Sequence, residues 1–238
     1  AAGARAGGVI YLDYQATTPL APEAKEAMLR WLDGPDGTGF GNPHSSHRLG
    51  RQAEAAVEVA RERVAALFPP GGQVVFTGSA TEALNLALRG CEPGRAGKPV
   101  AVSAIEHSAV LDTALDLPGD TTILPVDRDG LVNPQVALPA GLGVLAVLQV
   151  NNEIGTIQPV AELYARARSS GALLVCDAVQ AAGKLPIAEA DMIAISAHKF
   201  HGPKGIGALW VRDGIELHPL VTGGGQEKGL RSGTLSPA

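Results

Sequence analysis

The stretch Gly143-Val-Leu-Ala-Val-Leu-Gln-Val150 is an almost unbroken apolar run of strand length. It shows no alternation of polar and apolar residues, which is typical of a strand buried on both faces in a mostly parallel sheet. Similar runs recur at 73–76, 99–103, 121–125, 172–176, 191–196 and 206–211, and helical periods lie near 80–89, 107–117 and 159–170. This alternation predicts an α/β fold with a mixed, mostly parallel sheet of about seven strands and helices on both faces.

Two further helices are expected ahead of the sheet. Pro22 opens one that should run through Leu32, because proline is favoured in the first helical turn. The second should start near Ser45 or Ser46 and end before the Pro69-Pro-Gly-Gly72 turn. Apolar residues at spacings of three or four predict its buried face, namely Leu49, Ala53, Ala56, Ala60, Val64 and Leu67.

Composition excludes several classes of protein. Of the 238 residues 45% are hydrophobic and 18% charged, which favours a folded globular chain over a disordered one. A net charge of −5, without any basic block, argues against nucleic-acid or anionic-membrane partners. No apolar run reaches the length of a spanning helix, and the N-terminus has no hydrophobic signal core. Cys91 and Cys176 suggest neither a disulfide framework nor a zinc site, so we expect a soluble, reduced, cytoplasmic protein.

Small residues follow the first run of the sheet. Thr77-Gly-Ser-Ala-Thr-Glu82 leads into a predicted helix, where free backbone N–H groups and the helix dipole favour a phosphate. An ordinary helix N-cap explains this motif about as well. Because ligands of open α/β sheets bind outside the carboxyl ends of the strands, the residues after the other runs are candidates too.

Ionisable and amide side chains follow those other runs. His107 follows 99–103 and taken alone reads as a helix-start residue, while Asn151 and Asn152 follow 143–150 and could be turn residues. Asp177 ends the run 172–176, where a carboxylate would need a cationic partner or would serve as a helix N-cap. Lys199 lies at the end of 191–196, which suits an amine held in a low-dielectric site as a nucleophile.

These features share one predicted edge of the sheet. An anion cradle, an acid, an imidazole and a nucleophilic lysine together fit pyridoxal phosphate. A metal site is disfavoured because the histidines lack ligand spacing, and a dinucleotide site because no G-x-G-x-x-G follows a strand.

The chain resembles the cysteine desulfurases of the iron–sulfur-assembly type, within the class V aminotransferase group of pyridoxal-phosphate enzymes. The motifs that carry the resemblance run in one order from Tyr11 to Thr234: Tyr11-Leu-Asp-Tyr-Gln-Ala-Thr-Thr-Pro19, Gly41-Asn-Pro-His-Ser-Ser-His47, Phe76-Thr-Gly-Ser-Ala-Thr-Glu82, Glu106-His-Ser-Ala-Val-Leu111, Val150-Asn-Asn-Glu-Ile-Gly155, Asp177-Ala-Val-Gln180, Ser196-Ala-His-Lys-Phe-His-Gly-Pro-Lys-Gly205, Gly223-Gly-Gly-Gln-Glu227 and Arg231-Ser-Gly-Thr234. The resemblance implies an aspartate-aminotransferase-like fold, here as the large domain over 21–238 with residues 1–20 packing against a smaller domain that this sequence lacks.

The resemblance also implies a role for each matching residue. Lys199 would be the Schiff-base lysine, and the other cofactor contacts would be His107 stacked on the ring, Asp177 on the ring nitrogen, Gln180 on the phenolic oxygen, Asn152 on cofactor and substrate carboxylate, and Ala80, Thr81, Ser196 and His198 on the phosphate. Thr234 would reach the cofactor of the neighbouring subunit in a homodimer. The implied reaction converts L-cysteine to alanine and an enzyme persulfide that is passed to an iron–sulfur scaffold.

Two departures from the family pattern stand out. Gly78-Ser79 replaces the usual Ser-Gly order, which keeps both residues small. The segment that carries the sulfur-accepting cysteine is not in this sequence, and neither Cys91 nor Cys176 is expected to replace it. Three alternatives therefore stay open: a non-catalytic cofactor-binding partner, one half of a split enzyme, and a selenocysteine lyase or other class V lyase.

Overall fold

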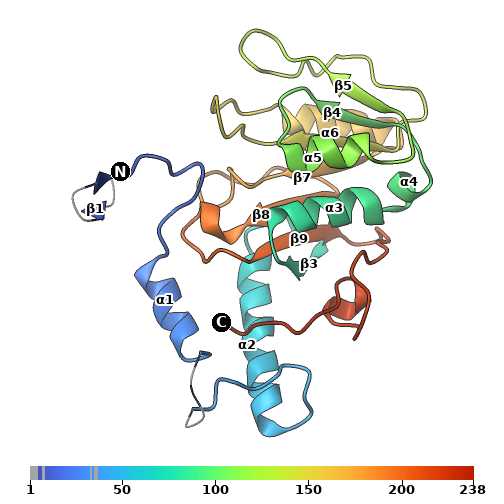
Figure 1. Ribbon diagram of the computed structural model, residues 1–238. Helices are drawn as coiled ribbons and strands as arrows, with labels where there is room; N and C mark the ends of the chain where they lie inside the picture. Colours follow the sequence, from blue (N-terminus) through green and yellow to red (C-terminus); the bar gives the residue numbers. More distant parts are fainter. Residues whose placement is uncertain (1–4, 7–8, 33, 35–36) are drawn as a thin grey trace.

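A seven-stranded sheet crosses the centre of the molecule (Figure 1). The computed structural model describes residues 5–6, 9–32, 34 and 37–238. The strands of the sheet are β3 (Gly72–Thr77), β4 (Val100–Ser103), β5 (Thr121–Leu124), β6 (Val144–Leu148), β7 (Leu173–Asp177), β8 (Met192–Ser196) and β9 (Gly207–Arg212). Each of the apolar runs predicted as strands is a strand, which confirms the predicted α/β architecture.

The directions of the strands bring most of their carboxyl ends to one edge. The order across the sheet is β3-β9-β8-β7-β6-β4-β5. Strands β8, β7, β6, β4 and β5 are parallel, whereas β9 is antiparallel to both of its neighbours, β3 and β8. Because β3 therefore runs in the direction of β8, every strand except β9 ends at the same edge. The predicted mixed, mostly parallel sheet is confirmed.

Helices cover both faces of the sheet, as predicted (Figure 1). One face carries α3 (Ala80–Gly90), α4 (Glu92–Arg95) and α5 (Ser108–Leu115), and the other carries α2 (Arg48–Ala65) and α6 (Val160–Ser169). Successive residues of β9 point to opposite faces, so that Leu209 joins the core under α3 and Trp210 joins the core under α2 and α6. Burial of each large apolar side chain in these cores contributes roughly 1.5–3 kcal/mol.

The helices ahead of the sheet differ from the prediction in detail. Helix α1 (Pro22–Leu29) ends before Leu32, because the N–H groups of Trp31 and Leu32 bond three residues back, to Met28 and Leu29. Helix α2 is capped by His47 rather than by a serine, and the Nδ1 of His47 accepts from the N–H of Gly50 at 3.3 Å.

The buried face of α2 is also rotated from the predicted one. Gly50, Ala53 and Val57 are buried, whereas Ala60 is exposed. The next position of the buried stripe is Arg61, a charged residue that a search for apolar spacing leaves out.

Short elements complete the described chain. Strands β1 (Arg5–Ala6) and β2 (Val9–Ile10) pair antiparallel, and the 3-10 turns η1 (Ala197–Lys199) and η2 (Glu227–Gly229) follow β8 and β9. Across the described ranges, none of the helices combines the length and apolar character needed to cross a membrane.

Candidate active site

A cavity of ≈ 460 Å³ opens at the edge where the carboxyl ends of the strands meet. Every residue predicted to bind the cofactor lines it, apart from Thr234. The lining residues are Asp13, Gln15, Ala16, Ser79, Ala80, Thr81, Leu84, His107, Ala109, Leu148, Val150, Asn152, Glu153, Asp177, Val179, Gln180, Ser196, His198 and Lys199. Tertiary structure thus gathers motifs that lie more than a hundred residues apart.

The N-terminus of α3 forms one wall of the cavity. Ser79 caps the helix by accepting a hydrogen bond from the N–H of Glu82 at 3.2 Å. The next residues, Ala80 and Thr81, line the cavity, where the free N–H groups of the first turn favour an anion. We call residues 77–81 the anion cup. The structure confirms the helix N-cap at Ser79, and phosphate binding at the same helix start, which faces the cavity, stays a prediction.

A glycine beneath the anion cup makes room for it. Gly207, at the start of β9, pairs with Thr77 of β3 and with Ser196 of β8. A Cβ at this position would lie 2.5 Å from the carbonyl carbon of Ser79 and 2.8 Å from the nitrogen of Ala80. Because such contacts are far shorter than van der Waals distances, the cup can sit here only over a glycine.

Lys199 reaches the cavity from η1, directly after β8. Its Nζ donates a hydrogen bond of 2.6 Å to the backbone carbonyl of Gln15. Burial lowers the pKa of Lys199, an effect that the carboxylates of Asp177 and Asp13 partly offset. The lowered pKa increases the share of neutral amine, which is the form that acts as a nucleophile.

Asp177, the last residue of β7, faces the same cavity and is 8% exposed. Its Oδ1 accepts from the N–H of Val179 at 2.9 Å, so it caps a turn rather than a helix. Burial raises the pKa of Asp177, while the Val179 hydrogen bond and the charges of His107 and Lys199 act against the rise. A buried carboxylate in this position favours a cationic ligand group.

The N-terminal segment closes one side of the cavity. The carbonyl of Gln15 accepts a second hydrogen bond, from Nε2 of Gln180 at 2.9 Å. Thr17 Oγ1 lies 3.1 Å from Nδ1 of His198, whose pKa is lowered by burial and by the charges of Lys199 and Lys204. The sequence does not mark Asp13, Gln15 and Ala16 as site residues. Their only signal is the turn-rich motif 11–19, which has no helical or strand period.

His107 and Asn152 each combine a structural position with a place in the cavity. His107 caps α5, its Nδ1 accepting from the N–H of Ala109 at 3.0 Å, and its ring lines the cavity. Asn151 folds the turn after β6, because its Oδ1 accepts from the N–H groups of Glu153 and Ile154 at 2.8 and 2.9 Å. That turn leaves Asn152 to face the cavity.

Glu106 lies behind this wall as a buried acid. Its Oε1 accepts from Ser103 Oγ at 2.5 Å and from the N–H of Leu148 at 2.9 Å, which ties the end of β4 to the end of β6. Burial raises the pKa of Glu106 to about 8, with the hydrogen bonds lowering it and the charge of Asp177 raising it further. Glu106 is therefore largely protonated near neutral pH.

Neither cysteine can serve as an exposed thiolate. Cys91 and Cys176 are free and fully buried, and neither lines the cavity. Burial raises the pKa of both thiols, most strongly that of Cys176. Thr234 is exposed and lies outside the cavity lining of this single chain.

Comparison with known proteins settles the family. Residues 10–236 match the family model described as aminotransferase class-V. The chain belongs to the class-V aminotransferase family. Among solved structures, this class-V chain is similar to a NifS-like protein (TM-score 0.87, 35% identity, 94% of this chain and 65% of that one). It is equally similar to SspA in complex with cysteine (TM-score 0.87, 37% identity, 95% of this chain and 69% of that one).

Several curated relatives of this chain are cysteine desulfurases. The IscS protein of Dictyoglomus turgidum is 42% identical over 94% of this chain, and that of Pectobacterium atrosepticum is 45% identical over 95%. A mitochondrial cysteine desulfurase of Arthroderma benhamiae is 42% identical over 96%. This chain spans 59%, 59% and 48% of the lengths of these three relatives.

Class-V aminotransferases and cysteine desulfurases are pyridoxal-phosphate enzymes, and the cavity of this class-V chain fits that cofactor. The buried Asp177 carboxylate suits a protonated pyridine nitrogen, and the cup over Gly207 suits a phosphate. The cavity volume lies within the range of small-molecule sites.

Proposed function

We propose that this chain is the cofactor-binding domain of a cysteine desulfurase. The observation that carries the proposal is the convergence of Lys199, Asp177 and the anion cup on one cavity. Identities of 42–45% to cysteine desulfurases over nearly the whole chain support the same assignment. The substrate we propose is L-cysteine, the ligand named with the similar SspA structure.

The residues of the cavity divide the binding of pyridoxal phosphate among them. Ala80, Thr81, Ser196 and His198 bind the phosphate, and Gln180 bonds the phenolic oxygen. His107 stacks on the ring, and Asp177 keeps the ring nitrogen protonated. Asn152 contacts the cofactor and the substrate carboxylate. When bound in this way, the cofactor withdraws electrons from the Cα of the substrate.

Lys199 and its neighbours do the proton chemistry. Its amine would hold the bound cofactor covalently, and the free amine would be placed to move a proton at the Cα of the substrate. Burial, which lowers the pKa of Lys199, keeps that amine available as a base. The carbonyl of Gln15 orients it through the 2.6 Å hydrogen bond.

The sulfur atom needs a thiolate acceptor. In the proposed reaction the C–S bond of L-cysteine breaks and an S–S bond to the acceptor forms. The electron pair left on Cβ takes a proton, which gives L-alanine. Because Cys91 and Cys176 are buried thiols with raised pKa, we propose that the acceptor thiolate comes from outside residues 1–238. An iron–sulfur scaffold is the proposed final recipient.

The proposed domain arrangement follows from the same assignment. Residues 21–238 form the large domain, and residues 1–20, of which 1–4 and 7–8 lie outside the described residues, pack with a smaller domain. The exposed Thr234 reaches the cofactor of a second copy across a homodimer. Two free cysteines support a cytoplasmic location.

The test uses the protein purified from its native gene. Its intact mass is compared with the 24.3 kDa of this chain, and it is then loaded with pyridoxal phosphate. L-cysteine is added with dithiothreitol, which releases transferred sulfur as sulfide, and alanine and sulfide are measured. We expect equal amounts of both, and neither from the Lys199→Ala variant.

Each alternative gives a different result in this experiment. Cofactor binding without alanine would favour a non-catalytic partner. Activity that appears only after a second chain is added would favour a split enzyme. Turnover of L-selenocysteine but not L-cysteine would favour a selenocysteine lyase. The first and third results would overturn the proposal, whereas the second would keep it and assign the acceptor thiolate to the second chain.

A further inference from the structure

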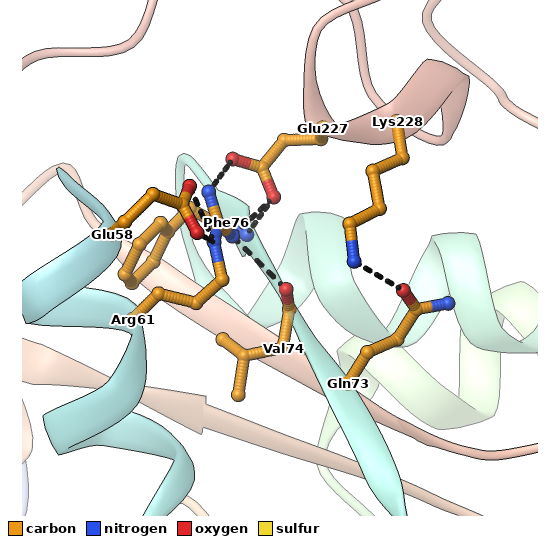
Figure 2. Close-up of polar contacts among 7 residues, drawn as sticks. All are labelled: Glu58, Arg61, Gln73, Val74, Phe76, Glu227 and Lys228. Carbon is orange, nitrogen blue, oxygen red and sulfur yellow. Dashed lines mark hydrogen bonds and ion pairs between the residues drawn. The ribbon is translucent and has the colours of Figure 1, made fainter. Parts of the chain in front are cut away.

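The C-terminal segment 223–234 is held against the strand that leads into the anion cup (Figure 2). Glu227 is buried, with a side chain 1% exposed, and pairs with Arg61 of α2 through contacts of 2.7 and 2.9 Å. Its Oε2 also accepts from the N–H of Phe76 at 3.0 Å, and Arg61 donates to the carbonyl of Val74 at 3.0 Å. The ion pair thus takes the place of a neighbouring strand along the open edge of β3.

Backbone strain at the same place shows how firmly the segment is held. Glu227 and Lys228 have positive φ angles of 50° and 54°, which residues with side chains rarely adopt. Such a conformation persists only where surrounding contacts over-determine it. Here the contacts are the Arg61–Glu227 pair and a 3.3 Å hydrogen bond from Lys228 to Gln73, both drawn in Figure 2.

The anchored segment places Arg231 against Glu82, which directly follows the anion cup in sequence. Its Nε donates to Oε1 of Glu82 at 2.8 Å, and the other oxygen of Glu82 accepts from the N–H of Gly78 at 2.7 Å. Burial alone would raise the pKa of Glu82, but the hydrogen bonds from Arg231 and Gly78 hold it below its ordinary value. Glu82 is therefore ionised in the first turn of α3, the helix whose N-terminus faces the cavity.

An ionised Glu82 poses an electrostatic conflict. The carboxylate accepts the hydrogen bond of the Gly78 N–H, yet it also puts a negative charge beside a site suited to a phosphate. Arg231 removes the conflict, because its guanidinium neutralises the carboxylate without disturbing the Gly78 hydrogen bond. The charged groups facing Arg231 are Glu82 and, from its own segment, Glu227.

We propose that Arg231 is a positioning residue for the anion cup, which neutralises Glu82 so that the cup accepts the phosphate of pyridoxal phosphate. The inference rests on the proposed cofactor site. It predicts whether each substitution raises or lowers the affinity for the phosphate. Arg231→Gln leaves the negative charge of Glu82 without a partner and lowers this affinity. Glu82→Gln leaves Arg231 as a cation without a partner and keeps or raises this affinity.

The test measures the affinity of the apoprotein for pyridoxal phosphate and for pyridoxal, which lacks the phosphate. For Arg231→Gln we expect affinity for pyridoxal phosphate to fall on the order of fivefold to tenfold, the effect of one unit charge near a partly buried site, with that for pyridoxal unchanged. The double variant Glu82→Gln/Arg231→Gln should regain most of the loss. Arg231→Lys, which keeps the charge, should retain more affinity than Arg231→Gln.

Arg89→Gln is the matched control, because Arg89 pairs with Asp116 at 2.8 Å near the opposite end of the same helix. It should change neither affinity, and thermal unfolding of each variant checks its fold. Equal losses for pyridoxal phosphate and pyridoxal, or a double variant as weak as Arg231→Gln, would overturn the inference and leave the cofactor site standing. A wild-type protein that binds neither probe would overturn the cofactor site and the inference together.

Discussion

The backbone carbonyl of Gln15 and the Nζ of Lys199 are joined by a hydrogen bond of 2.6 Å. The same carbonyl also accepts from Gln180 at 2.9 Å, so one oxygen orients two side chains of the cavity. A segment that precedes the first long helix thereby closes the site built by the sheet.

Removal of Lys199 should abolish covalent attachment of the cofactor. Borohydride fixes a lysine-bound cofactor to its peptide, and peptide mass spectrometry then locates it. We expect the label on Lys199 in the wild-type protein and none in Lys199→Ala. Lys204→Ala, which removes an exposed lysine outside the cavity lining, should keep the label. A label at Lys184 in the wild-type protein would contradict the assignment.

Asp177→Asn should slow proton exchange at the substrate Cα while the protein stays folded. Without the carboxylate the ring nitrogen loses its ionic partner, and exchange of the Cα hydrogen of L-alanine should fall on the order of 100-fold. Proton NMR in deuterated water measures this exchange.

Asp191→Asn is the control for loss of a buried carboxylate outside the cavity. Asp191 is similarly buried, but it accepts from the Tyr164 hydroxyl and the N–H of Leu174 and pairs with Arg212 at 3.6 Å, away from the cavity. We expect it to lower the unfolding temperature while the folded protein exchanges at the wild-type rate. Similar exchange rates in both variants would argue against the role of Asp177.

Gly207→Ala should distort the anion cup. The new methyl group would lie 2.5 Å from the backbone of Ser79, so the cup must shift. We expect a loss of about 1–3 kcal/mol in the free energy of unfolding, together with at least a roughly tenfold loss of affinity for pyridoxal phosphate. Denaturant unfolding and fluorescence titration measure the two effects. Gly34→Ala, where a Cβ meets nothing within 4 Å, should change neither.

Glu106 should make stability fall as pH rises. Its folded-state pKa of about 8 lies above the ordinary value of 4.5, so the folded protein holds a proton that the unfolded chain releases between these values. The free energy of unfolding therefore decreases with pH across that window, by at most about 1.4 kcal/mol per pH unit from this group.

Glu106→Gln carries no titrating proton and should remove this contribution. The stability of the variant relative to wild type should rise from pH 5 to pH 8 and level off above it. Urea unfolding at several pH values measures the difference. Glu162→Gln replaces an exposed carboxylate on α6, and its free energy of unfolding should change with pH in the same way as that of wild type. A difference that is constant with pH would show that Glu106 is ionised in the folded state.

Local sequence determined the elements of the sheet and most of the cavity wall. Apolar runs such as Val144–Leu148 have the length of a strand and no polar residues, so both faces of the strand are buried in the sheet. Once the strands are parallel, their carboxyl ends share an edge, and because β7 lies beside β8, Asp177 and Lys199 come to the same cavity. Resemblance to the family added the roles of these residues, which periodicity does not contain.

Only the tertiary structure decided how the irregular segments close the site. The carbonyl of Gln15 bonds Lys199 across 184 positions, and every residue has such a carbonyl, so no side-chain pattern marks the one that is used. The charged Arg61 occupies a buried stripe of α2 because Glu227, 166 positions away, neutralises it there. Long-range pairs of this kind depend on loop closure and on exact strand order, whereas strands and helices arise from neighbours in the sequence.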